Sequence, residues 1–209
     1  MKLENNTNNI FLKKTKGLAS QLKMAPEMRK SDIKDYKNTE NIIQSAVLIL
    51  LYKKKGELYL LLTKRSGKLL KHKGQISFPG GKKDISDINL RQTAIREAEE
   101  EIGISKNIDI IGELTPLLIP VTNFCVHQFV AYIPQLPQLK INTDEVDYIL
   151  EVAISDLQNS DNIKYKNFGT STSGRYVKAP YFDIDGNEIW GATAMMISEL
   201  LDALKDGKS

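Results

Sequence analysis

Residues 89–103 combine the signals that begin and end an amphipathic helix, and they restrict the fold more than any other stretch of the chain. Asn89 is a favourable N-cap residue, and Gln92 three positions later completes a pattern similar to a capping box. Gly103 suits the position just after a helix, where the backbone turns left-handed. Between these signals, apolar side chains recur at helical spacing and form a stripe that must face a core: Ala94, Ile95, Ala98 and Ile102.

The same helix carries acidic side chains where a helix tolerates them least. Glu97, Glu100 and Glu101 stand at positions i, i+3 and i+4, so all three project from one face. Like charges at this spacing repel, and acids near the C-terminal end oppose the helix dipole, at a cost of about 0.3–1 kcal/mol each. A divalent cation such as Mg²⁺ prefers carboxylate oxygens and would offset that cost. The alternative is a solvated acidic helix surface.

The segment before this helix favours the metal interpretation. A strand-like run over residues 58–63 leads through a polar loop into Phe78-Pro79-Gly80-Gly81. Pro79 restricts Phe78 to extended conformations, and the two glycines permit close backbone approach. We expect a carbonyl of Gly80 or Gly81 to complete a metal shell, and the alternative is an ordinary tight turn.

These residues carry a resemblance to the Nudix hydrolases, whose signature is G-x5-E-x7-R-E-U-x-E-E-x-G-U, with U a bulky aliphatic residue. Residues 96–104 match its second half, apart from Ala98 at the first U position. The first half departs, because no Glu occupies the expected place and the spacing from Gly81 to Arg96 is one residue too long. That departure is typical of the coenzyme A diphosphatase branch, which carries G-G-K-x-D-x-x-D where residues 80–87 read GGKKDISD.

The same branch also carries L-L-T-x-R-S/A-x3-R-x3-G-x3-F-P-G-G ahead of this box. Leu70 stands at the second arginine, so one phosphate or nucleotide contact that the branch implies is missing. Segments 142–146 and 189–194 also resemble stretches that recur in this branch, and the resemblance covers residues 44–205. The other positions of the L-L-T-x-R motif are matched in register by Leu61, Leu62, Thr63, Arg65, Ser66, Gly74 and residues 78–81.

The resemblance implies an α/β fold: a Nudix-type α/β/α sandwich with a mixed β-sheet, plus an N-terminal helical extension. It implies hydrolysis of a coenzyme A-type diphosphate to 3′,5′-ADP and 4′-phosphopantetheine, with Mg²⁺ or Mn²⁺ as the cofactor. Arg96 is expected to pair with a carboxylate and fix the loop against the helix. Glu145 is expected to act as a fourth carboxylate or as the general base, or else it is a surface acid. The metal ligands implied by the resemblance are Glu97, Glu100 and Glu101, and the backbone of Gly81 is expected to join them from the glycine-rich turn.

We predict that substrate contacts come from the end of the 58–64 strand and the loop after it, through Lys64, Arg65, Ser66, His72 and Phe78. The alternatives are solvated strand-end charges for Lys64 and Arg65 and a surface position for His72. Two other functions stay open. One is hydrolysis of another nucleoside diphosphate derivative, such as NADH, ADP-ribose or a dNTP, which the loss at Leu70 allows. The other is a non-catalytic binding module of the same fold, against which the complete acid set argues.

Length and composition predict one globular domain with an extension. The chain has 209 residues, of which 41% are hydrophobic. Residues 1–41 are predicted to form the N-terminal extension, partly mobile and helical over 17–30, and residues 42–209 the Nudix domain. We expect helices over 154–159 and 193–204, a turn at Asp185-Gly186, and strands over 42–52, 58–64, 109–113, 125–133, 149–153 and 176–182.

Charge and cysteine content narrow the partners. Residues 1–40 carry nine Lys/Arg against five acids, whereas the rest carry 20 against 21, and no basic stripe is interleaved with aromatics. We therefore expect no nucleic-acid partner, and the resemblance implies a small nucleotide diphosphate as substrate. No apolar run approaches the length of a membrane span, and a secretory signal is absent. The single Cys125 excludes an internal disulfide, which fits a reducing, cytoplasmic location. A homodimer stays open.

Overall fold

A mixed sheet forms the centre of the computed structural model, which describes residues 16–30, 41–68, 73–104, 108–169 and 176–205. Within these ranges β1 and β6 run parallel, and the other pairs of this sheet are antiparallel. The strand order is β3-β2-β1-β6-β5, with β7 added to β2 and β4 added to β1. The strands are β1 (Ile43–Lys54), β2 (Glu57–Arg65), β3 (Ile76–Ser77), β4 (Gly80–Lys82), β5 (Ile110–Ile119), β6 (Phe124–Ile133) and β7 (Val146–Ala153).

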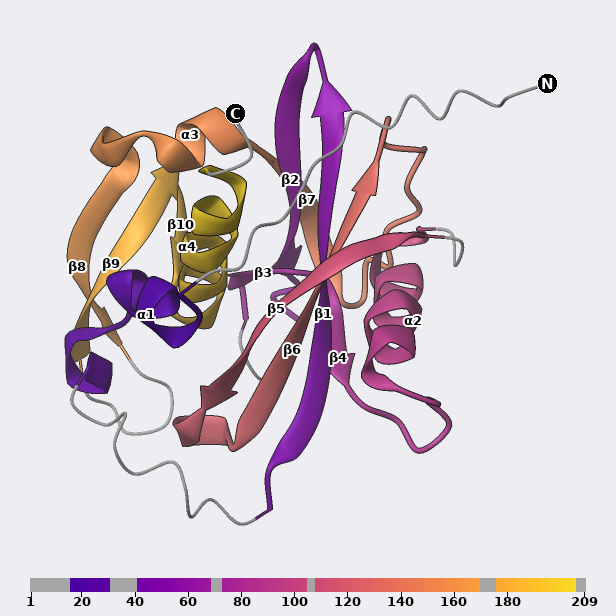
Figure 1. Ribbon diagram of the computed structural model, residues 1–209, viewed down its shortest axis with the longest axis horizontal. Helices are drawn as coiled ribbons and strands as arrows, with labels where there is room; N and C mark the ends of the chain where they lie inside the picture. Colours follow the sequence, from indigo (N-terminus) through magenta and orange to yellow (C-terminus); the bar gives the residue numbers. More distant parts are fainter. Residues whose placement is uncertain (1–15, 31–40, 69–72, 105–107, 170–175, 206–209) are drawn as a thin grey trace.

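Two helices cover opposite faces of this sheet, α2 (Leu90–Ile102) on one side and α4 (Gly191–Lys205) on the other (Figure 1). A second, antiparallel sheet lies beyond α4 and has the order β10-β9-β8. The remaining short elements include η5 (Pro120–Thr122), α3 (Ile154–Gln158) and η6 (Ser160–Asn162). The strands of the second sheet are β8 (Ile163–Gly169), β9 (Tyr176–Ile184) and β10 (Asn187–Trp190).

The alternation of side chains along β1 explains why this strand is hydrophobic without a break. Leu48 and Leu50 face α2 and join one core cluster, whereas Ile49 and Leu51 face α4 and join the other. All four side chains are fully buried. A strand covered on both faces reads as a continuous apolar run, which is the pattern of residues 46–52.

The predicted α/β sandwich with a mixed sheet is confirmed, and each predicted strand and helix of the main body has its counterpart. The prediction of one helix over residues 17–30 is wrong. Pro26 holds Ala25 in an extended conformation and breaks the segment into α1 (Leu18–Gln21), η1 (Leu22–Met24) and η2 (Glu27–Lys30). Strand β8 was not predicted, because its side chains are largely polar and its order comes from pairing with β9.

The N-terminal segment from α1 to η2 lies against α4 and contributes to the core (Figure 1). Met24 and Ala25 are buried in the cluster on the α4 side. Gln21, itself fully buried, donates from Nε2 to Oε2 of Glu199 at 2.7 Å and to the carbonyl of Thr115 at 2.8 Å. Because Glu199 is also fully buried, the segment supplies a hydrogen-bond donor to a carboxyl group inside the core.

We expect Gln21→Ala to lower the free energy of unfolding by about 2–3 kcal/mol, because it leaves the buried Glu199 short of a donor. Chemical denaturation checks this. Lys23→Ala is the matched control in the same segment, because it removes only an exposed ion pair with Asp202 and should cost less than about 1 kcal/mol. Equal losses in the two variants would contradict the prediction.

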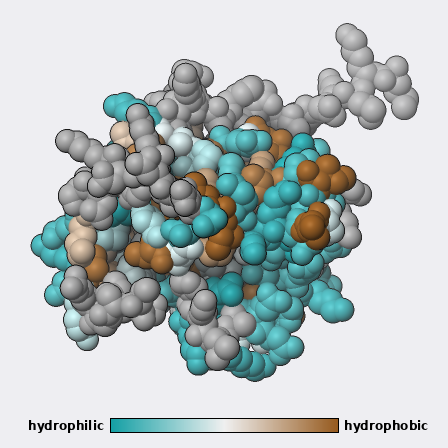
Figure 2. All heavy atoms as spheres, turned by 90° about the horizontal axis from the view of Figure 1, so that it is seen from below, coloured by the Kyte–Doolittle hydropathy of each residue, from teal (hydrophilic) through white to brown (hydrophobic). Residues whose placement is uncertain are grey.

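On the face seen from below, hydrophobic side chains form separate patches among hydrophilic surface (Figure 2). The exposed apolar side chains of the protein include Ile85 and Ile88, in the loop between β4 and α2, and Val121 in η5. Among the described helices, none has the length and apolar character needed to cross a membrane.

Candidate metal-binding and catalytic site

Helix α2 has the ends that its sequence predicts and three of the four side chains of the predicted buried stripe, whereas Ile95 is only half-buried. Oδ1 of Asn89 accepts from the amide of Gln92 at 2.9 Å, and Gly103 closes the helix with φ of 68°. Ala94, Ala98 and Ile102 are fully buried against the sheet. The acidic residues lie beside this stripe, so the helix presents them along the junction with β4.

Arg96 is held by a residue that the sequence analysis did not single out as a site residue, Asp87. The guanidinium donates from Nε and Nη2 to the two carboxylate oxygens of Asp87, both at 2.9 Å. Asp87 is 4% exposed and also accepts from Thr93 Oγ1 and from the amide of Asp84. The Arg96 hydrogen bonds hold the pKa of Asp87 far below its usual range. This bidentate pair fixes the loop after β4 to the middle of α2.

The remaining nitrogen of Arg96 gathers two of the predicted metal ligands. Nη1 lies 2.9 Å from Oε1 of Glu97 and 3.0 Å from Oε2 of Glu100. The predicted pairing of Arg96 with box carboxylates is therefore present, and Asp87 is its main partner. The Glu100 side chain is 53% exposed, whereas that of Glu97 is 16% exposed. Burial raises the pKa of Glu97, and the Arg96 charge opposes that rise.

Gly81 lies directly beneath the carboxylate of Glu97. A Cβ atom at position 81 would stand 2.4 Å from the carboxyl carbon of Glu97, closer than two non-bonded carbon atoms can approach. Gly81 pairs with Ala46 in β1, so its backbone is fixed against the sheet. The glycine therefore permits the contact between strand β4 and the acidic face of α2, as its sequence position suggested.

Glu101 is the most deeply buried acid of the group, at 3% exposed. Its Oε2 has no hydrogen-bond partner among the described residues, and its Oε1 lies 3.7 Å from Nη1 of Arg65. Burial raises the pKa of Glu101 to about 8. The Arg65 charge and the Gly80 amide oppose that rise, whereas Glu97 and Glu145 add to it. A buried carboxylate with an unused oxygen in this setting is suited to bind a cation.

Glu145 reaches the same place from a distant part of the chain. The amide of Asn142 donates to the carbonyl of Glu101, and Asn142 Nδ2 donates to Glu145 Oε1 at 3.2 Å. The carbonyl of Glu145 in turn accepts from the amide of Ser66. Glu145 lies close enough to Glu97 and Glu101 to raise the pKa of both. Helix α2, strand β2 and the loop before β7 thus meet at one acidic site.

The residues present fit a divalent cation without forming a finished metal shell. Among the described residues no three acidic, histidine or cysteine side chains already converge on one point. Arg96 and Arg65 instead draw the carboxylates toward themselves. The unpartnered Oε2 of Glu101, the carboxylate of Glu97 and the backbone of Gly81 supply the hard oxygen donors that Mg²⁺ and Mn²⁺ prefer.

The other predicted substrate residues do not all lie beside the acidic site. The Lys64 ammonium lies 5.1 Å from the centre of the Tyr148 ring, and neighbouring residues of a strand face opposite ways, so Lys64 faces away from Arg65 and the acids. Ser66 is fully buried, and its hydroxyl accepts from the amide of Lys68 within a turn. Phe78 is 2% exposed inside the core, so its ring offers no binding surface and that prediction needs correction. His72 lies outside the described residues.

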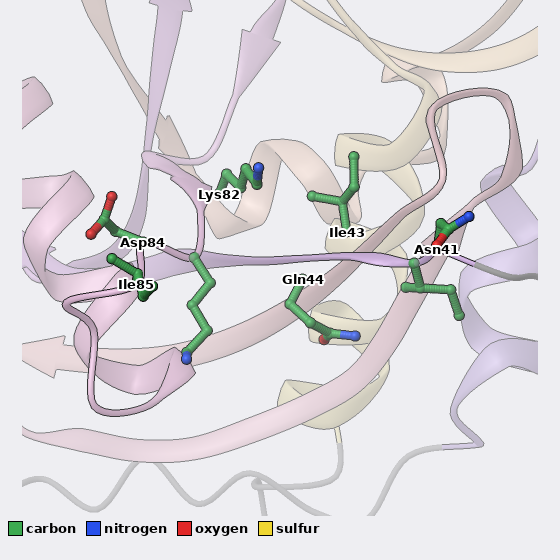
Figure 3. A pocket seen from close by; sticks show the side chains of 8 residues that line it. Asn41, Ile43, Gln44, Lys82, Asp84 and Ile85 are labelled. Carbon is green, nitrogen blue, oxygen red and sulfur yellow. The ribbon is translucent and has the colours of Figure 1, made fainter.

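A surface hollow of about 510 Å³ lies beside β1 and the loop after β4 (Figure 3). Asn41, Gln44, Lys82 and Asp84 are among the side chains around it. None of the predicted site side chains lines this hollow. The acidic site therefore has to be identified from its contacts and charges and not from the shape of the surface.

The position of Gly81 gives a direct test of the acidic site. We expect Gly81→Ala to push the Glu97 carboxylate away and to weaken Mn²⁺ binding about tenfold, while the fold survives because residue 81 has no left-handed backbone. Metal titration by calorimetry measures this. Gly67→Ala, in the loop after β2 with open space around it, is the control that should bind Mn²⁺ as the wild type does.

Comparison with known proteins shows which family the chain resembles. The NUDIX domain family matches residues 43–168. The human mitochondrial coenzyme A diphosphatase NUDT8 is 34% identical over 166 residues, which cover 78% of this chain and 70% of that protein. An uncharacterised Nudix hydrolase, NudL of Photorhabdus laumondii, is 35% identical over 142 residues, covering 68% of this chain and 74% of that protein.

The solved structures include similar folds. The MutT protein from Methanosarcina mazei Go1 aligns with a TM-score of 0.50 at 21% identity, over 80% of this chain and 96% of that one. At this identity the likeness concerns the fold alone.

Proposed function

Because this chain belongs to the NUDIX domain family and is a Nudix hydrolase, we propose that it hydrolyses the diphosphate bond of coenzyme A or its derivatives. The products would be 3′,5′-ADP and 4′-phosphopantetheine, or its acyl form. Support for this substrate comes from the relatives, which include coenzyme A diphosphatases of human mitochondria and mouse peroxisomes. The observation that carries the chemistry is the buried Glu101, with its unused oxygen, beside Glu97 and Glu145.

In this proposal Glu97, Glu101 and the Gly81 carbonyl hold Mg²⁺ or Mn²⁺, and the more exposed Glu100 completes the set. When bound, the cation neutralises the charge of the diphosphate and activates water. Glu145 serves as a further carboxylate or takes the proton of the attacking water. The oxygen of that water bonds to one phosphorus, the bond from this phosphorus to the bridging oxygen breaks, and the bridging oxygen leaves on the other phosphate.

Arg96 acts as a positioning residue in this scheme. Its bidentate contact with Asp87 leaves Nη1 aimed at Glu97 and Glu100, so the guanidinium sets where these carboxylates lie before a cation binds. Arg65, at the end of β2 and 3.7 Å from Glu101, is the cation best placed to meet the substrate phosphates.

The experiment that tests this function is product analysis with purified protein and Mg²⁺ or Mn²⁺. The panel is coenzyme A, acyl-coenzyme A, NADH, ADP-ribose and dNTPs. Release of 3′,5′-ADP from coenzyme A is the expected result. Cleavage of another compound with coenzyme A left intact would keep the hydrolase and reject the substrate, and it would point to the loop that contains Leu70. Cleavage of none of them would favour a binding module.

A further inference from the structure

Arg65 and Glu101 face each other as a pair of unlike charges with unused hydrogen-bonding atoms. Their closest contact is 3.7 Å, longer than a good hydrogen bond. Arg65 Nε and Glu101 Oε2 are both buried and have no hydrogen-bond partner among the described residues. The Glu101 side chain is 4% exposed, whereas that of Arg65 is 28% exposed. The two side chains attract each other by charge, but they lack the two parallel hydrogen bonds of a strong arginine–carboxylate pair.

Arg96 provides the contrast within the same site. It makes two hydrogen bonds of 2.9 Å to one buried carboxylate, so its guanidinium cannot leave without exposing two charges to a low-dielectric interior. Within the described part of the chain, Arg65 has one long contact of 3.7 Å with Glu101 to lose. Arg96 is therefore fixed in place by Asp87, whereas the side chain of Arg65 is able to exchange Glu101 for another anion.

The backbone of Arg65 is fixed even though its side chain is weakly held. Its amide donates to the carbonyl of Gln75 at 2.9 Å, and its carbonyl accepts from the amide of Gly74 at 3.1 Å. The pairing of β2 with β7 shifts register between Lys64 and Arg65, and the unmatched residue, Asp147, belongs to β7, so β2 itself runs on without an inserted residue. Rotation of the Arg65 side chain alone would thus carry its charge from Glu101 to the edge of the site.

We propose that Arg65 is an exchangeable counter-ion: it neutralises Glu101 in the metal-free protein and transfers to the substrate's diphosphate when Glu101 turns to the cation. This inference rests on the proposed function for the identity of the diphosphate, but the exchange itself concerns any phosphoanhydride ligand. The guanidinium matches phosphate oxygens in shape and charge. The exchange keeps Glu101 paired before and after the cation arrives, so the buried carboxylate is never left without an opposite charge.

The test compares Arg65→Gln with wild type by thermal unfolding at pH 8.5, with and without saturating Mn²⁺. Without metal, Arg65→Gln should lower Tm by about 3–6 °C, because Glu101 loses its counter-ion. With Mn²⁺ the two proteins should melt within about 1 °C of each other. Calorimetry should show Mn²⁺ binding about threefold to tenfold tighter in Arg65→Gln, since the competing cation is gone. Arg65→Lys, which keeps the charge, should lie between them and serves if the glutamine variant does not fold.

Lys64→Gln is the matched control, because it removes the same charge from the neighbouring residue, whose ammonium lies over Tyr148. Its Mn²⁺ affinity should rise less than twofold, and a rise equal to that of Arg65→Gln would overturn the exchange. A Tm loss in Arg65→Gln that persists unchanged in Mn²⁺ would overturn it too. With Mn²⁺ present, KM for coenzyme A should rise about tenfold in Arg65→Gln, and an unchanged KM would reject the transfer to substrate. If wild type fails to cleave coenzyme A, the proposed function fails, while the melting comparison still decides the exchange of Glu101.

Discussion

Replacement of Glu97 by glutamine is expected to slow diphosphate hydrolysis about 10³-fold at saturating Mg²⁺. The substitution keeps the shape of the side chain and removes its charge, so the contact with the Gly81 backbone survives while a hard anionic oxygen is lost. The folded protein should tolerate the change well, because burial and the neighbouring acids already raise the pKa of Glu97. Steady-state kinetics with coenzyme A measures the loss, and circular dichroism checks the fold.

Two further variants serve as controls for the rate loss in Glu97→Gln. Glu99→Gln removes an acid from the opposite side of α2, so it should keep the wild-type rate within about twofold. Glu100→Gln changes a side chain that is 53% exposed and should fall between the other two. A loss below tenfold in Glu97→Gln would show that the acidic face of α2 is not where the cation acts. Equal losses in Glu97→Gln and Glu99→Gln would point to the charge of the whole helix instead.

Local signals were sufficient to predict helix α2 and its acidic face. The cap at Asn89, the stop at Gly103 and the apolar stripe all act within a few residues, so each can be read from the chain without knowing its partners. Strand β1 could be predicted equally well from its sequence, because burial on both faces requires a continuous apolar run. The glycine-rich turn suggested that Gly80 or Gly81 joins the acidic site, but no local rule relates a strand glycine to an acid sixteen residues later, so the contact of Gly81 with Glu97 comes from the structure.

The errors arise where tertiary contacts decide. Phe78 was predicted to contact the substrate as part of the segment ahead of the acidic helix, yet its side chain is 2% exposed and belongs to the core. Asp87 was visible only as a member of a motif. The signal that would have identified it is the pattern of two aspartates shortly before a helix that carries an internal arginine, but one sequence does not say which aspartate turns inward. Strand β8 needed its partner β9 to be recognised.

Asp87→Asn is expected to be the most destabilising conservative change in the site, lowering the free energy of unfolding by about 3–5 kcal/mol at pH 7. The asparagine cannot accept both hydrogen bonds from Arg96, and its amide group would point N–H atoms at the guanidinium. The Arg96 charge then stays in the middle of α2 without its main counter-ion, and only Glu97 and Glu100 remain beside it among the described acids. Urea denaturation at neutral pH measures the loss. Asp84→Asn, which changes an exposed carboxylate of the same loop that accepts from Ser86, should leave the free energy of unfolding close to that of the wild type.

The pH dependence separates this pair from a simple loss of packing. The pKa of Asp87 is depressed in the folded protein, so its contribution is present above the unfolded value of about 3.9 and is lost as the pH falls toward the folded value. The gap in stability between wild type and Asp87→Asn should therefore be full at pH 7 and should narrow below about pH 4. A gap that stays constant from pH 7 to pH 3 would mean that the variant acts through shape and not through charge. A narrowing gap, together with weaker Mn²⁺ binding in Asp87→Asn, would show that the buried aspartate positions the acidic face of α2 through Arg96.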